Sequence, residues 1–100
     1  MNKSEKIAYQ QLIDEGCPEE LIEKPRRNKW LPQDFFYCWD FIAFDLKSKI
    51  IRFVQVSSKY FSQRKKEDQE RMKAFPKFKN TTREYWRWIQ KEKRFIKENL

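Results

Sequence analysis

The spacing of apolar and polar residues predicts a helix and two strands in the first half of the chain. Over residues 4–15, apolar side chains recur at helical spacing, and Gly16 follows where such a helix would end. Residues 36–45 are rich in aromatic and apolar side chains on both faces, which predicts a strand in the middle of a sheet. Residues 45–49 then predict a hairpin connection to a partner strand over residues 50–57.

The sequence pattern of the second half of the chain also predicts both helices and a strand. Residues 62–75 have helix-forming composition and stop before a proline, residues 81–90 alternate as a strand, and residues 91–100 predict a short tail helix. Residues 23–30 are irregular and hold at most a short edge strand. This order predicts a single α/β domain over residues 1–100, with a small mixed central sheet flanked by helices.

Positive charge is concentrated towards the C-terminus. The chain has 23 basic and 15 acidic side chains, and residues 61–100 alone carry a net charge of +7 out of a total of +8. Such a surface favours a polyanionic partner such as nucleic acid. The same composition fits a lysine-rich protein from a heat-adapted source, and the charge alone does not separate these two interpretations.

The sequence also disfavours several classes of protein. Charged residues interrupt the longest apolar runs and no signal peptide is recognisable, so we expect no membrane association and a cytoplasmic location. Histidine is absent and Cys17 lies far from Cys38, which argues against a zinc module and a Ser-His-Asp arrangement and predicts free thiols. Gly16 is the single glycine, so a glycine-rich phosphate loop is excluded.

Two polar residues interrupt the predicted strands. Asp40 lies within residues 36–45, and Gln55 lies near the end of the next strand, followed by Ser57 and Lys59 on the same strand face. A buried polar side chain is costly unless it is paired, binds a metal or takes part in chemistry. Asp40 is therefore either a site residue or a buried carboxylate that caps a bulge or pairs with an arginine. Gln55 is either a site residue or an ordinary hydrogen-bonding group of the core.

This arrangement of an Asp on one strand and a polar-x-polar pair at the end of the next resembles the PD-(D/E)XK nuclease superfamily, in particular its small archaeal Holliday-junction resolvases. The resemblance implies a restriction-endonuclease-like αβββαβ core. In that family an Asp and a Glu on adjacent strands hold a divalent metal, and a Lys two residues beyond the Glu helps to orient the attacking water. A Glu on the first helix often completes the site. The matching positions here are Asp40, Gln55 and, on the first helix, Glu5.

The chain departs from the family pattern at two positions. Gln55 offers a neutral carbonyl oxygen where the family has Glu, which weakens the binding of a hard cation. Ser57 replaces the family Lys, and Lys59 is the candidate to take its role from the same strand face. The resemblance thus implies a Mg²⁺ or Mn²⁺ ion held by Asp40 and Gln55, with Lys59 and Glu5 as further catalytic residues.

From the resemblance we expect metal-dependent endonuclease cleavage of phosphodiester bonds, on DNA, by a homodimer. The metal would polarise a phosphoryl oxygen and lower the pKa of a bound water. Trp86 and Trp88 either stack on exposed bases or pack within the sheet. A set of basic residues is expected to contact the phosphate backbone: Arg26, Arg27, Lys29, Arg64, Lys65 and Lys66.

Two other functions stay open at this point. The changes at Gln55 and Ser57 would leave a catalytically inactive domain that binds DNA without cutting it. A third hypothesis is a small assembly protein whose basic surface binds an acidic protein partner.

Overall fold

The chain folds into a five-stranded mixed sheet between two helices in the computed structural model, which describes residues 1–25, 35, 38–58 and 62–100, the side chains of 62–65 excepted. The α/β class predicted from the sequence is confirmed. The elements along the chain are α1 (Lys3–Asp14), a 3₁₀ turn (Glu19–Leu21), β1 (Ile22–Glu23), β2 (Phe41–Asp45), β3 (Ile50–Ser57), α2 (Ser62–Ala74), β4 (Thr81–Ile89) and β5 (Arg94–Asn99).

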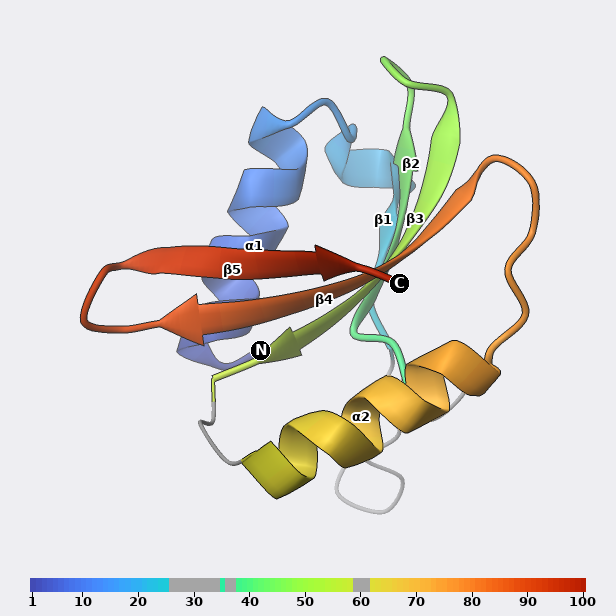
Figure 1. Ribbon diagram of the computed structural model, residues 1–100. Helices are drawn as coiled ribbons and strands as arrows, with labels where there is room; N and C mark the ends of the chain where they lie inside the picture. Colours follow the sequence, from blue (N-terminus) through green and yellow to red (C-terminus); the bar gives the residue numbers. More distant parts are fainter. Residues whose placement is uncertain (26–34, 36–37, 59–61) are drawn as a thin grey trace.

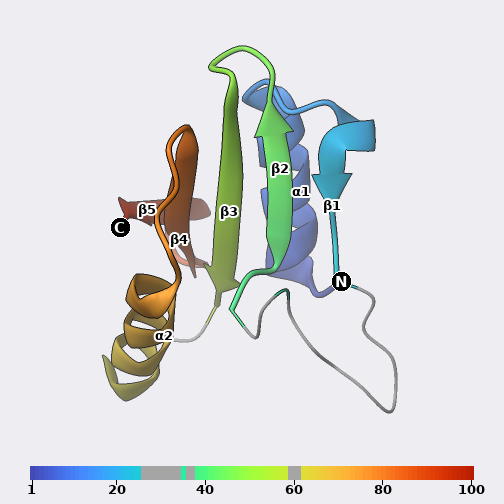
Figure 2. The same ribbon diagram turned by 90° about the vertical axis from the view of Figure 1, so that its right-hand side faces the viewer.

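The strands lie side by side in the order in which they occur along the chain. Neighbouring strands are antiparallel except β3 and β4, which are parallel and are connected through α2. α1 covers one face of the sheet and α2 the other (Figures 1 and 2). Because β3 and β4 run in the same direction, they end at the same edge of the sheet, and α1 begins beside that edge (Figure 1).

Local interactions fix both ends of α1. The Oδ1 atom of Asn2 accepts a hydrogen bond from the backbone N–H of Glu5 at 2.9 Å, and the side-chain amide of Asn2 donates to Glu5 Oε1 at 2.9 Å. The first bond satisfies one backbone donor that the start of the helix leaves open, and the second holds the two side chains together. At the other end, Gly16 adopts a φ of 115° while the N–H of Cys17 donates to the carbonyl of Leu12 at 3.0 Å. Glycine adopts this conformation without a steric penalty.

The sheet carries a separate apolar cluster on each face. Under α1, the buried cluster consists of Ala8, Leu12, Cys17, Ile22, Phe41, Ala43, Val54, Val56, Trp86 and Phe95. Under α2, it consists of Cys38, Trp39, Met72 and Tyr85, with Phe35, Phe53, Phe75 and Leu100 packed against it. The rings of Trp39, Phe53 and Phe75 lie 5.1–5.7 Å apart between centroids. Aromatic packing therefore anchors α2, which is otherwise very polar.

A buried ion-pair network joins α1 to the sheet. The guanidinium of Arg52 donates to both carboxylate oxygens of Glu84 at 2.8 Å and to Glu15 at 2.9 Å. Glu84 also accepts a hydrogen bond from the hydroxyl of Thr82. Burial by itself raises the pKa of Glu84, but the hydrogen bonds from Arg52 and Thr82 outweigh that effect and leave the pKa lowered. Each buried charge in this network is thus compensated.

Two elements differ from the sequence-based prediction. The expected tail helix over residues 91–100 is wrong, because this segment forms the strand β5 after a turn in which Lys93 has a φ of 51°. Its alternation places Phe95 against Trp86 and Trp88, with ring centroids 5.3 and 5.0 Å away, so sheet packing determines its conformation.

The first central strand is also shorter than predicted. β2 begins at Phe41 rather than at residue 36, because the N–H groups of Cys38 and Trp39 both donate to the carbonyl of Phe35 and close a turn.

Neither helix in the described part of the chain combines the length and apolarity needed to span a bilayer.

Candidate functional site

The candidate site lies at the edge of the sheet where β3 and β4 end and α1 begins. A cavity of about 140 Å³ opens there, lined by Met1, Glu5, Lys24, Pro25, Asp40 and Phe41. These residues come from the start of α1, the segment after β1 and the start of β2. The fold therefore brings together residues that lie far apart in the sequence.

Asp40 occupies the bend directly before β2 and is 4% exposed. Its N–H donates to the carbonyl of Val54 at 2.8 Å, and its Oδ2 atom accepts from the N–H of Val56 at 2.7 Å. The carboxylate thus takes the place of a backbone acceptor for β3, which fixes its orientation. This matches the structural interpretation of Asp40 as a capping group, and it also holds the carboxylate at the cavity.

Glu5 lies in the first turn of α1 and is 7% exposed. Its backbone and side chain are both bonded to Asn2, so part of its role is to stabilise the start of the helix. Glu5 and Asp40 line the same cavity, so two acidic residues from distant segments border one small space. Carboxylate oxygens are the ligands that Mg²⁺ and Mn²⁺ prefer, and Mg²⁺ is commonly held by one or two carboxylates together with water.

Gln55 does not belong to this cavity. It lies opposite Tyr85 in the parallel register, on the side of the sheet that carries α2. Its Oε1 atom is buried and makes no hydrogen bond with the part of the chain that the structure describes. The structure thus brings Asp40 and Glu5 together and leaves Gln55 outside the cavity lining.

The structure adds Lys24, which sequence reasoning did not select. Lys24 directly follows β1 and lines the cavity, and its Nζ atom lies 4.7 Å from the centroid of the Tyr9 ring. In the sequence, Lys24 stands out only as a lysine next to a short strand. That position does not identify it as a site residue unless it is known which end of β1 lies beside α1. Lys24 is the basic side chain among the residues that line the cavity.

The remaining predicted residues fall partly outside the described part of the chain. Lys66 lies on α2 and is exposed. Arg64 and Lys65 belong to α2, but their side chains are not described, and Arg26, Arg27, Lys29 and Lys59 lie outside the described residues.

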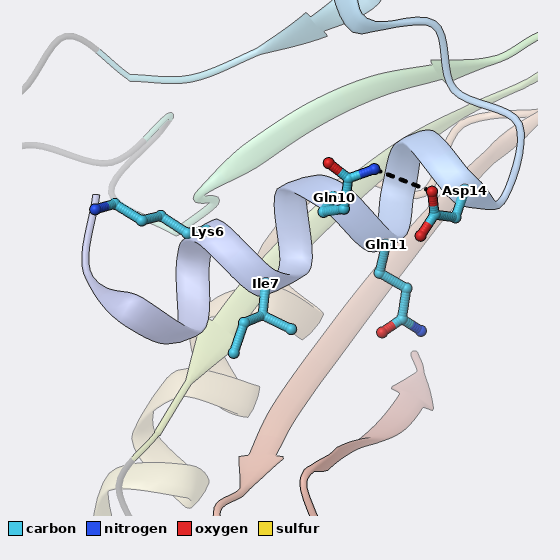
Figure 3. A pocket seen from close by; sticks show the side chains of 5 residues that line it. All are labelled: Lys6, Ile7, Gln10, Gln11 and Asp14. Atoms are coloured by element: carbon cyan, nitrogen blue, oxygen red, sulfur yellow. Dashed lines mark hydrogen bonds between the residues drawn. The ribbon is translucent and has the colours of Figure 1, made fainter.

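A larger hollow in the described part of the chain carries a different set of groups. A hollow of about 510 Å³ runs along α1 and is lined by Lys6, Ile7, Gln10, Gln11 and Asp14 (Figure 3). Two of its polar side chains are already paired, since Gln10 donates to Asp14 at 3.0 Å and Gln11 donates to Glu15 at 2.8 Å. Among the described residues, no group of three or more His, Cys, Asp or Glu side chains is placed to hold a metal ion. The pair at the cavity is therefore the strongest candidate in that part of the chain.

Comparison of the chain with protein-family models, with curated proteins and with solved structures finds no match.

Proposed function

We propose that this protein binds nucleic acid and cleaves phosphodiester bonds as a metal-dependent endonuclease acting on DNA. The observation that carries the proposal is the convergence of Asp40 and Glu5 on one cavity. The element order supports it, because α1, β1–β3, α2 and β4 follow the αβββαβ order that the resemblance to PD-(D/E)XK nucleases implies, with β5 added at the edge.

The residues of the cavity would have different roles in the reaction. Asp40 and Glu5 would hold a Mg²⁺ or Mn²⁺ ion, which supplies polarisation of the phosphoryl oxygen and a more acidic bound water. The N–H of Val56 fixes the carboxylate of Asp40, and Asn2 fixes that of Glu5. Fixed ligands lower the cost of assembling the site. Lys24 would contact the phosphate and offset its negative charge.

Basic residues around this edge would contact the phosphate backbone. Lys3, Lys24 and Lys66 are exposed there or on the neighbouring helix. The proposal extends this set to the sequence-predicted residues Arg26, Arg27, Lys29, Lys59, Arg64 and Lys65. It also includes a cytoplasmic location, which suits the free thiols of Cys17 and Cys38, and a homodimer that contacts both strands of a duplex.

The test is a cleavage assay on plasmid, single-stranded and branched DNA and on RNA, with Mg²⁺, with Mn²⁺ and with chelator. Asp40→Asn and Glu5→Gln should each lower the cleavage rate by about 100-fold or more, since even partners that only orient a metal ligand contribute 10- to 100-fold. Glu70→Gln is the matched control because it removes one charge from an exposed position on α2. Cleavage that persists in chelator, or in both site variants, would overturn the proposal.

A second candidate is a nucleic-acid-binding module of the same fold without catalytic activity. The observation that favours it is the neutral side chain of Gln55, which lies outside the cavity. Such a module would bind DNA with a strong salt dependence, and Asp40→Asn would leave its affinity unchanged. If no nucleic acid binds at physiological salt, both candidates fail, and the basic surface is better explained by an acidic protein partner.

A further inference from the structure

A second cavity lies at the same edge of the sheet, next to the carboxylate cavity. It has a volume of about 310 Å³ and is lined by Asn2, Lys3, Ser4, Ser58, Trp88 and Gln90. The two cavities share the first turn of α1, since Met1 and Glu5 line one and the three residues between them line the other. The second cavity is therefore adjacent to the proposed cleavage site.

Trp88 forms an aromatic wall of the second cavity. Trp39 and Trp86 are fully buried, whereas Trp88 is only partly buried and lies at the end of β4. Its ring packs edge-on against Phe95 with centroids 5.0 Å apart, and its indole N–H donates to Gln90 Oε1 at 2.8 Å. These two contacts hold the ring in place, so it presents an ordered apolar surface.

The charge and polarity of this cavity are compatible with a ligand that combines an uncharged ring with a negatively charged chain. None of its six lining residues is acidic, and Lys3 adds a positive charge. Ser58 is exposed and adds a hydroxyl group to the lining, whereas the buried hydroxyl of Ser4 already donates to Asn2 Oδ1 at 2.9 Å. Its volume falls at the lower end of the range for small-ligand pockets, which begins at about 300 Å³. Aromatic side chains beside basic residues are the common means of holding unpaired bases.

We propose that this cavity is a subsite for an unpaired nucleobase, which stacks on Trp88 while Lys3 contacts the adjoining phosphate. This inference rests on the proposed function and deepens it by naming the substrate class. A paired base keeps its faces within the duplex stack, so an aromatic wall of this kind selects nucleic acid with an unpaired nucleotide next to the phosphate bound at Asp40.

The experiment measures binding of the full chain to a fluorescent single-stranded oligonucleotide and to a blunt duplex of the same sequence, in chelator so that nothing is cleaved. Trp88→Ala should weaken binding of the single strand by about 5- to 150-fold, the range expected for loss of one stacked base. Binding of the duplex should change less than about 2-fold, and Trp88→Phe should retain most of the affinity because it keeps a ring.

Two further readouts separate stacking from folding. Unlabelled single strand should quench tryptophan fluorescence in the wild type and much less in Trp88→Phe. Ser58→Glu places a negative charge at an exposed position of the cavity, so it should weaken binding of the single strand even if Trp88→Ala does not fold. Phe78→Ala, at an exposed site after α2, is the control expected to have no effect.

The outcomes are distinguishable from those of the cleavage test. Equal weakening of single strand and duplex in Trp88→Ala, or unchanged single-strand binding in Ser58→Glu, would overturn the subsite while leaving the cleavage proposal intact. Selective loss of single-strand binding in a protein that does not cleave would support the subsite and refute the nuclease.

Discussion

Asp40 combines two roles that the individual bonds allow us to separate. One carboxylate oxygen accepts the N–H of Val56, and Asp40 lines the cavity that Glu5 also lines. The first role needs only an acceptor oxygen, whereas the proposed metal site needs negative charge. An amide satisfies the first requirement and fails the second.

We therefore predict different effects of Asp40→Asn and Asp40→Ala on stability. Asp40→Ala leaves the buried N–H of Val56 without its acceptor and should lower the free energy of unfolding by about 1–3 kcal/mol. Asp40→Asn keeps a carbonyl oxygen and should cost clearly less. Denaturant unfolding monitored by circular dichroism measures both, with Glu70→Ala as an exposed control. Equal stability of the alanine variant and the wild type would show that the hydrogen bond contributes nothing.

Besides the apolar contacts, an arginine of the sheet binds the C-terminal end of α2. The guanidinium of Arg83, on β4, donates to the carbonyls of Lys73 at 3.1 Å and Phe75 at 2.8 Å. The end of α2 leaves carbonyl groups without helical partners, and Arg83 satisfies them. Apart from these bonds, Met72 and Phe75 provide the apolar contacts of this helix with the sheet.

Replacing Arg83 by Met should loosen α2 while the sheet stays intact. Each lost hydrogen bond is worth about 0.5–1.5 kcal/mol, so amide exchange in α2 should accelerate by about 10-fold or more. Hydrogen exchange with mass spectrometry compares peptides from α2 with peptides from β3 and β4. Arg94→Met is the control because Arg94 is exposed and forms an exposed ion pair with Glu92. A uniform acceleration across the sheet would contradict this prediction.

Most helices and strands could be predicted from the local spacing of apolar residues, and the predictions that are wrong have physical causes. β3 has the predicted bounds, residues 50–57, because alternating apolar side chains continue along its whole length. The prediction of a helix over residues 91–100 is wrong because charged residues surround Phe95, and the local pattern does not indicate a strand. The contact of Phe95 with Trp86 in the sheet accounts for β5. Long-range packing of this kind leaves no signal within the segment itself.

Only part of the candidate site could be predicted from the sequence, because the rest depends on contacts between distant segments. The sequence identified Asp40 and Glu5 as candidates, but the family resemblance also implied that Gln55 joins Asp40 in one metal site. In the structure Asp40 lies at a bend before β2 and lines the cavity together with Phe41, whereas Gln55 lies on the side of α2. Lys24 was missed because its position depends on where the end of β1 meets α1.

The ion-pair network under α1 makes the stability of the whole molecule depend on pH. The pKa of Glu84 is lowered as described above. For Glu15, burial raises the pKa, but hydrogen bonds from Lys97, Gln11 and Arg52 leave it lowered as well. A carboxyl group whose pKa is lower in the folded state stabilises the fold above its unfolded pKa, and this stabilisation is lost as the pH falls through the folded value.

Stability should accordingly decline as the pH falls below about 4.5, the ordinary value for glutamate. Glu84→Gln should lower stability at neutral pH, because it leaves the charge of Arg52 less well compensated, and should flatten the decline in acid. Urea unfolding at a series of pH values between 7 and 3 measures both effects. Glu70→Gln should keep the wild-type profile, and an unchanged acid slope in Glu84→Gln would contradict the assignment.

The parallel pairing of β3 and β4 has a consequence for synthesis on the ribosome. β3 leaves the exit tunnel long before β4, because the whole of α2 is translated between them. During that interval one edge of β3 has no partner, although β2 already occupies the other edge. The nascent chain thus exposes an open strand edge until β4, which ends at Ile89, has also left the exit tunnel, and this is the period in which it is most vulnerable to pairing with other chains.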